Sequence, residues 1–215
     1  MPNELISPRA MTPIMPSVEQ AGKNNVHVTN QDGGVVNINY TINTGEPTDS
    51  ADKMIAIQRF SREYYQLIVT GEEDVFDTNV VTVTADRALT QRLVPPEIFE
   101  RCSTLTEDGI AELLTFPAIV CRENTAFRGE TDANQYALYC YIKRIKKEGR
   151  YIKVGFKPIL PFPQIKMCTK KNALYFDLNM DCTITDLNHS AWSVHKVNLF
   201  DAFDEAGLSH MPRPY

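Results

Sequence analysis

The chain has 215 residues, 43% of them hydrophobic, and a formal net charge of −5. This length allows one hydrophobic core of ordinary size or two small ones, and the acidic balance excludes the strongly basic profile of a dedicated nucleic-acid-binding domain. The charge is uneven, because residues 1–115 carry 8 basic and 17 acidic side chains and residues 116–215 carry 14 and 10. This asymmetry indicates an interaction surface, or two halves that face each other.

The cysteines and the termini constrain the compartment and the chemistry. The five cysteines are scattered without a C-x-x-C pair, which argues against a disulfide framework and a zinc site, and no cofactor is expected. Residues 1–24 are proline-rich and polar, are expected to form a flexible tail, and lack the apolar core of a signal peptide. No window is long and apolar enough to span a membrane. The sequence therefore predicts a cytoplasmic protein without a membrane partner.

A polar β-hairpin arm is predicted over residues 25–45. Residues 26–29 and 36–42 are its strands, joined by a glycine-rich turn, and the second alternates strictly. An isolated two-stranded hairpin is marginally stable in water. The arm is therefore expected either to dock on the main body or to pair with a second copy of the chain. In the second case the oligomerisation face consists of Val36, Ile38, Tyr40 and Ile42.

Residues 46–115 are predicted to be a helical region. A first helix begins at the caps Asp49 and Ser50, ends at Gly71, and carries an apolar stripe of Met54, Ile57, Phe60, Tyr64 and Ile68. An acidic loop and a short strand at residues 80–83 follow. Three short helices are then expected, over residues 86–93, from the pair Pro95-Pro96 to residue 101, and over residues 106–114.

Residues 116–208 are predicted to form an antiparallel, β-rich domain of small barrel type, followed by a tail over residues 209–215. Asn198 is the expected N-cap of a closing helix that ends at Gly207, and the prolines at 158, 161 and 163 are expected to interrupt the strands. The fold class expected for the whole chain is α+β. The strand candidates are residues 118–121, 136–147, 150–157, 173–178 and 191–197.

A basic hairpin over residues 136–157 is the most informative feature. Between Lys143 and Lys171 the chain has ten Lys or Arg residues and one acid, Glu148. Exposed rings and ammonium groups together are what a single-strand binder needs, because bases stack and phosphates pair with cations. The alternatives are an acidic protein partner, or a solvated face whose lysines protect a sheet edge. The expected contact face comprises Tyr139, Tyr141, Lys143, Lys147, Tyr151 and Lys153.

A polar loop follows the strand at residues 118–121. Its Arg122 and Arg128 are further candidates for partner binding, because each guanidinium can grip a carboxylate or a phosphate through two hydrogen bonds. Each arginine also has a glutamate nearby, at Glu123 and Glu130, which can neutralise it in solvent. The sequence leaves both interpretations open.

Two other patterns contain residue types that can carry chemistry. Residues 177–181 open like an EF-hand loop, but Cys182 replaces the turn glycine and Asn188 the bidentate glutamate, so no metal is expected. His189 and His195 flank Trp192, with Ser193 nearby, and could serve a hydrolase or nuclease if one of them held a nucleophile beside an oxyanion hole. The competing interpretation is that the histidines hydrogen-bond around the tryptophan.

Two short segments carry a resemblance. Residues 35–45 resemble asparagine- and glycine-rich strands beside effector modules in bacterial defence proteins, and residues 190–207 are similar to the ending of a group of uncharacterised bacterial proteins. The resemblance implies a bacterial or phage setting and no catalytic residue.

The sequence as a whole predicts a non-enzymatic binding or scaffold protein. Its basic hairpin is expected to contact an anionic partner, either an acidic protein surface or a single-stranded nucleic acid. One alternative is a hydrolase or nuclease acting around His189 and His195. The other is a structural oligomer assembled through residues 26–43.

Overall fold

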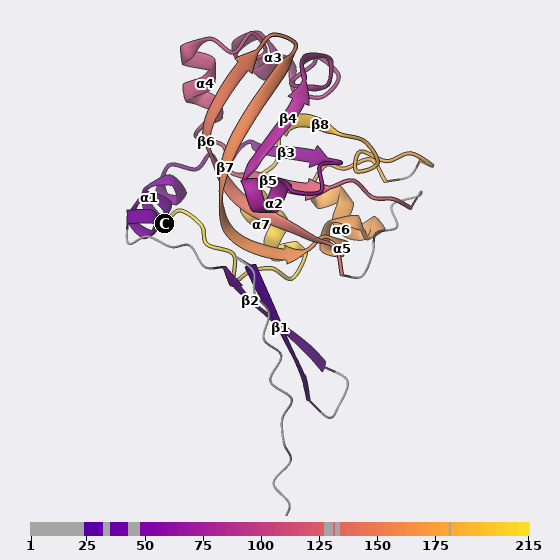
Figure 1. Ribbon diagram of the computed structural model, residues 1–215. Helices are drawn as coiled ribbons and strands as arrows, with labels where there is room; N and C mark the ends of the chain where they lie inside the picture. The colour runs from indigo at the N-terminus through magenta and orange to yellow at the C-terminus, as the bar shows by residue number, and fades with distance from the viewer. Residues whose placement is uncertain (1–23, 32–34, 43–47, 127–130, 132–133, 181) are drawn as a thin grey trace, which may run out of the picture. The chain divides into compact units, whose positions relative to one another are not determined.

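The computed structural model describes residues 24–31, 35–42, 48–126, 131, 134–180 and 182–215. Contacts divide the chain into two compact units, Met1–Asn43 and Thr44–Tyr215. The first unit contains strands β1 (Asn24–Gln31) and β2 (Val35–Ile42), which pair antiparallel (Figure 1). These strands coincide with the alternating tract and its expected partner. The expected tail, apart from Asn24, and the turn at residues 32–34 lie outside the described residues.

The second unit is an α+β fold built on one mixed sheet, with the strand order β4-β7-β6-β5-β3-β8. All neighbouring strands are antiparallel except β3 and β5, which are parallel. The sheet curls into a half-barrel (Figure 1). The strands are β3 (Tyr65–Thr70), β4 (Val80–Thr84), β5 (Ala118–Arg122), β6 (Tyr136–Glu148), β7 (Tyr151–Pro163) and β8 (Ala191–His195).

Short helices pack around this sheet. The helices are α1 (Thr48–Gln58), α2 (Val75–Thr78), the 3-10 turn η1 (Ala85–Arg87), α3 (Pro96–Cys102), α4 (Glu107–Leu113), α5 (Ile165–Cys168), α6 (Lys170–Tyr175) and α7 (Leu199–Glu205). The N-cap that the sequence predicts at Asn198 is present, because its side chain accepts from the backbone N–H of Phe200. The hydroxyl of Thr106 also caps α4, by accepting from the backbone N–H of Gly109. No helix in the described part of the chain is long and apolar enough to cross a membrane.

Each face of the sheet has its own hydrophobic core. The core on the concave face contains Ile68, Val154 and Trp192, together with residues of α3 and α4. The core on the other face contains Tyr139 and Phe203, together with residues of α1, α5, α6 and α7. A strand with a core on each side needs apolar residues at consecutive positions, and all six residues of β3 are buried.

This double burial explains why the segment after Gln58 is a strand and not the helix that its apolar stripe predicts. The helix expected from Asp49 to Gly71 ends at Gln58, and the chain continues as β3. Tyr64 and Ile68, placed on one helical stripe with Phe60, belong to the concave core, whereas Phe60 belongs to the other. A short apolar run fits either period, so the stripe did not distinguish a helix from a fully buried strand. One strand of the sheet, β3, therefore comes from a segment predicted to be a helix, whereas the short strand expected at residues 80–83 is confirmed as β4.

Four further expectations differ from the structure. The prolines do not interrupt β7, because β4 pairs with β7 only up to Gly155, so residues 158–163 have a strand neighbour on one side only, where a missing N–H is tolerated. The strand expected at residues 173–178 is instead helix α6 and the turn after it, with Thr169 as the N-cap. Residues 86–93 contain only the end of the turn η1 rather than a helix. The expected antiparallel domain is also corrected, since the β3–β5 pair is parallel.

Candidate functional site

A β-bulge in β6 decides which side chains of the basic hairpin share a face. Ile142 pairs with Phe156 and Arg144 pairs with Gly155, so Lys143 has no partner in the register. Beyond the bulge the alternation is reversed, and Ile145 packs against the concave core as Ile142 does. The expected grouping of Lys143 and Lys147 with Tyr139 and Tyr141 on one face is therefore wrong.

The two expected stacking rings on β6 are inside the protein. Tyr139 is 0% exposed and Tyr141 is 9% exposed. The Tyr139 ring packs edge-on against Phe203 at 5.2 Å between centroids, and its hydroxyl donates to the carbonyl of Pro212 at 2.9 Å. Burial raises the pKa of Tyr139. These tyrosines fill the core beneath α7. The prediction that they contact a partner is therefore wrong.

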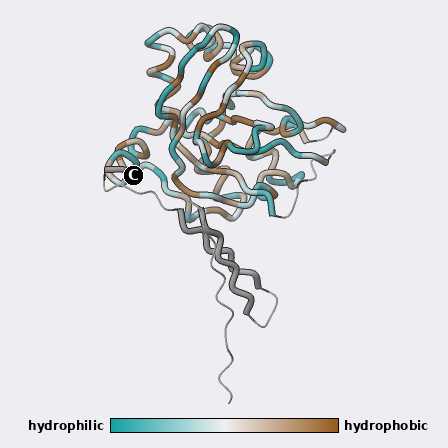
Figure 2. The backbone as a smooth tube through the Cα atoms, viewed as in Figure 1, coloured by the Kyte–Doolittle hydropathy of each residue, from teal (hydrophilic) through white to brown (hydrophobic). Residues whose placement is uncertain are grey.

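The end of the hairpin, residues 143–153, is called the basic tip here. Its lysines and arginines are exposed, whereas Ile145 is half-buried and Ile152 is buried. The hairpin is formed by β6 and β7 (Figure 1), and its end is mostly hydrophilic (Figure 2). Glu148, its one acid, lies 2.8 Å from Lys146 Nζ and 2.7 Å from Lys153 Nζ. Hydrogen bonds from Lys146 and Lys153 lower the pKa of Glu148 to about 2. The single carboxylate is therefore shared by two of the ammonium groups.

Other cations of the basic tip remain without an acidic partner. Within the part of the chain that the structure describes, Lys143, Arg144 and Lys147 make no ion pair. The Arg144 side chain lies over Gly155, where an added Cβ would come within 2.9 Å of its Cγ and Nε atoms. A hollow of about 330 Å³ beside this contact is lined by Lys143, Arg144, Asn79 and Lys157.

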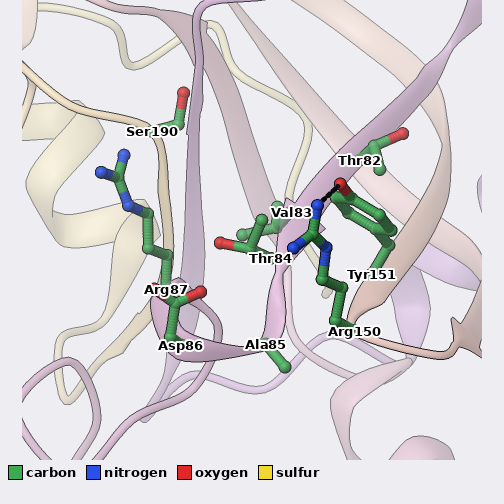
Figure 3. Close-up of a pocket in the computed structure, with 9 residues that line it drawn as sticks. All are labelled: Thr82, Val83, Thr84, Ala85, Asp86, Arg87, Arg150, Tyr151 and Ser190. Carbon is green, nitrogen blue, oxygen red and sulfur yellow. Dashed lines mark hydrogen bonds between the residues drawn. The ribbon is translucent and has the colours of Figure 1, made fainter.

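A larger hollow of about 700 Å³ is lined by β4, the turn η1, the start of β7 and Ser190 (Figure 3). Arg87 and Arg150 both line it, with Asp86 beside them. A hydrogen bond from Thr84 lowers the pKa of Asp86, and the two arginines add to this effect. The hollow therefore combines two guanidinium groups with hydroxyls and one ionised carboxylate.

Tyr151 is the exposed ring of the basic tip, with 38% of its surface accessible. The Arg150 guanidinium lies 5.0 Å from the centre of this ring and donates to the Tyr151 hydroxyl at 2.8 Å. Tyr151 and Lys153 therefore remain on the surface as the sequence predicts, and one ring is available where three were expected.

Arg122 of the polar loop makes its contacts away from the basic tip. Arg122 donates to the carbonyl of Glu73, and its guanidinium lies 5.4 Å from the centre of the Phe76 ring. Both contacts are within the chain, so Arg122 serves local structure. Arg128 lies outside the described residues. The side-chain surroundings of the four expected oligomerisation residues, Val36, Ile38, Tyr40 and Ile42, also lie outside the described part.

The two histidines line one hollow of about 320 Å³ at the opposite edge of the sheet, beside β8. His195 Nε2 lies 2.9 Å from Ser193 Oγ, and His195 Nδ1 lies 3.4 Å from Asp177 Oδ2. His189 is exposed. His195 therefore has a hydroxyl on one ring nitrogen and a carboxylate on the other, rather than a contact with the Trp192 indole, which donates to Gln66 at 3.1 Å.

Sequence reasoning missed three residues of these sites. Arg87 and Arg144 lie beside the hollows of the basic tip, and Asp177 is brought to His195 from 18 residues earlier. The pairing of Arg144 with Gly155 has one sequence signal, since a glycine inside a strand often marks the close approach of another group. No sequence pattern signals the contact between Asp177 and His195.

Among the described residues, no group of three or more His, Cys, Asp or Glu side chains is placed to hold a metal ion. Comparisons with protein-family models, with curated proteins and with solved structures found no match to this chain.

Proposed function

We propose that the basic tip binds the backbone of a single-stranded nucleic acid. The observation that carries the proposal is the excess of exposed cations there: Lys143, Arg144 and Lys147 have no acidic partner among the described residues, and the one acid of the tip is already shared. Clustered cations of this kind attract phosphates and release their counterions on binding. The net charge of −5 is that of the whole chain, whereas the basic tip itself carries six Lys or Arg residues and one Glu, so the overall charge does not oppose a local contact.

Two features favour a nucleic acid over an acidic protein surface. The first is the hollow in which Arg87 and Arg150 lie with threonine hydroxyls, since guanidinium and hydroxyl groups are common ligands of phosphate oxygens. The second is Tyr151, whose exposed ring offers a base one stacking surface worth about 1–3 kcal/mol. With a single ring, affinity is expected to depend mainly on charge, and base preference to be weak.

The test is the binding of a short labelled single-stranded oligonucleotide, followed by fluorescence anisotropy at about 50 and about 200 mM salt. If Lys143, Arg144, Lys147 and Arg150 each contact a phosphate, the affinity should fall by roughly 50-fold between these conditions, because each contact contributes about 0.7 to the logarithmic slope. The double substitution Lys143→Glu/Lys147→Glu should abolish binding.

The matched control is Lys170→Glu/Lys171→Glu, which makes the same change of charge on α6, away from the basic tip (Figure 1). It should leave the affinity within about twofold, since charges beyond a Debye length of about 10 Å are screened. Equal losses in both variants would mean unspecific attraction and would overturn the proposal. Binding of a polyglutamate peptide but not of the oligonucleotide would assign the basic tip to an acidic protein partner instead.

A further inference from the structure

Ser193, His195 and Asp177 are arranged as the three groups of an acyl-transfer site. The hydroxyl oxygen of Ser193 lies 2.9 Å from His195 Nε2, and the opposite ring nitrogen, Nδ1, lies 3.4 Å from Asp177 Oδ2. In such an order the imidazole can accept the hydroxyl proton while the carboxylate orients the ring and stabilises its positive charge. Such a hydroxyl–imidazole–carboxylate arrangement is recognised by its geometry and not by the positions of the three residues in the chain.

The fold holds the three groups together from two elements. Ser193 and His195 are two residues apart on β8, so their side chains point to the same face of the sheet. Asp177 follows α6 in a left-handed conformation with φ of 55°. Side chains from a strand and from a helix end thus meet, although 16 residues of sequence separate Asp177 from Ser193.

Tyr65 connects these two elements. It lies directly opposite His195 in the β3–β8 register, and its ring stacks on the imidazole at 5.0 Å between centroids. Its hydroxyl donates to the carbonyl of Phe176, the residue before Asp177, at 2.6 Å. Tyr65 is fully buried, so one rigid side chain positions both the imidazole and the backbone that carries the carboxylate.

The hollow beside these residues has the size and chemistry for a small ester. It measures about 320 Å³, and its wall includes Val69, Leu93 and Ala191 as apolar contacts for an acyl chain. Arg92 also lines it and has no acidic partner among the described residues. A cation there is available to stabilise the negative oxygen that develops when a carbonyl is attacked.

We propose that this hollow is a hydrolytic site for carboxylic esters with a short acyl chain, with Ser193 as the nucleophile, His195 as the general base and Asp177 as its orienting carboxylate. Ser193 Oγ bonds to the ester carbonyl carbon, its proton passes to His195 Nε2, and the carbonyl electrons form an alkoxide beside Arg92. The alkoxide then collapses, the ester C–O bond breaks, and the leaving alcohol takes the proton from His195. A water molecule, deprotonated by His195, attacks the acyl-serine and releases the carboxylic acid and free Ser193.

One competing contact sets the resting state. Ser193 Oγ also lies 3.3 Å from the carbonyl of Leu67, so the hydroxyl proton has two acceptors. The distance to His195 Nε2 is 2.9 Å and the distance to the Leu67 carbonyl is 3.3 Å, so the hydrogen bond to His195 is the stronger of the two. Rotation of the hydroxyl between these acceptors requires no movement of the strand.

The test uses the full chain and an alkyl fluorophosphonate. In this reaction Ser193 Oγ bonds to phosphorus, the P–F bond breaks, fluoride leaves and the proton goes to His195. Mass spectrometry should locate a single adduct on Ser193 and none in Ser193→Ala. Asp177→Asn should slow labelling by roughly 100-fold or more, and His195→Gln should abolish it. Asp177 is mostly exposed, so its amide variant is expected to remain folded, which circular dichroism checks.

The control is Ser190→Ala, because this serine lies on the same stretch of chain but bonds Glu123 instead of a histidine. Its labelling rate should equal that of the native protein. The absence of an adduct on native Ser193 would overturn the proposal, and so would equal labelling rates in the native and Asp177→Asn proteins. The native chain should also hydrolyse 4-nitrophenyl butyrate faster than Ser193→Ala does. Labelling without this turnover would overturn the assignment of short acyl esters.

Discussion

The side chain of Arg144 lies on the backbone of Gly155, its partner across the β6–β7 pair, so closely that a Cβ atom at position 155 would come within 2.9 Å of the Arg144 Cγ and Nε atoms. Glycine at this position therefore provides the surface on which the arginine rests. The β-bulge at Lys143 produces this contact, because without it a different residue of β6 would face Gly155.

This contact makes a prediction about Gly155→Ala. The free energy of unfolding should change by less than about 1 kcal/mol, because the displaced atoms belong to an exposed, flexible side chain and alanine suits a strand better than glycine. Oligonucleotide affinity should fall as Arg144 is displaced. In an Arg144→Ala background the same substitution should have no further effect on affinity, and a double-mutant cycle measured by anisotropy checks this. Additive losses would contradict the coupling.

Removal of the acid in the basic tip should strengthen oligonucleotide binding. Glu148→Gln leaves Lys146 and Lys153 without their carboxylate, which raises the local positive charge by one. The affinity at low salt should rise and its salt dependence should become steeper. Anisotropy titrations against Glu205→Gln, an exposed glutamate on α7, isolate the effect of position from that of net charge. A weaker complex in Glu148→Gln would mean that the carboxylate orders the lysines for binding.

Tyr65→Phe should slow the labelling of Ser193 while preserving the fold. The substitution removes only the hydroxyl that bonds the Phe176 carbonyl, so Asp177 loses part of its positioning relative to His195. A small misplacement of a catalytic group can lower a rate by up to roughly 100-fold. Tyr64→Phe, on the neighbouring residue and in the other core, removes a hydroxyl that bonds Glu97 and should leave the labelling rate unchanged. Equal rates in the two variants would show that Tyr65 has no positioning role.

Gln66 joins three buried groups and should be required for stability. Its amide nitrogen donates to the carbonyls of Leu113 and Phe116, and its oxygen accepts from the Trp192 indole. Gln66→Leu leaves the Trp192 indole without its partner and removes a donor from the carbonyls of Leu113 and Phe116, and it should lower the free energy of unfolding by about 2–5 kcal/mol. Urea unfolding followed by circular dichroism measures this, and the exposed Gln91→Leu should change it by less than about 0.5 kcal/mol.

Thiol reactivity should be confined to one cysteine. Burial raises the pKa of Cys168 to about 11 and that of Cys102 to about 12, and Cys121 and Cys140 are also buried with raised pKa values. Near pH 8 these thiols remain protonated and covered, whereas Cys182 is exposed. A disulfide reagent should therefore show one fast phase, which Cys182→Ser removes. Fast reaction of a second thiol in that variant would contradict the burial.

Several elements could be predicted from the sequence because their determinants are local. The caps Thr106 and Asn198 begin α4 and α7 where a side-chain oxygen can accept from the first turn. The turn at Gly149 joins two strands of suitable composition and has a positive φ of 62°. The alternating tract at residues 36–42 coincides with β2 for the same reason. In each case the pattern depends on neighbours within a few residues.

Only the tertiary structure decided the rest. β3 is a strand because a core covers each of its faces. In the sequence, its apolar residues also fit the spacing of a helical stripe, as Tyr64 and Ile68 do. The bulge at Lys143 turns Arg144 onto Gly155, while Tyr139 and Tyr141 are buried by α7 and its neighbours. The sequence by itself determined that the hairpin at residues 136–157 is basic and aromatic. Which of its side chains meet solvent, and that Asp177 meets His195, followed from packing between segments distant in the chain.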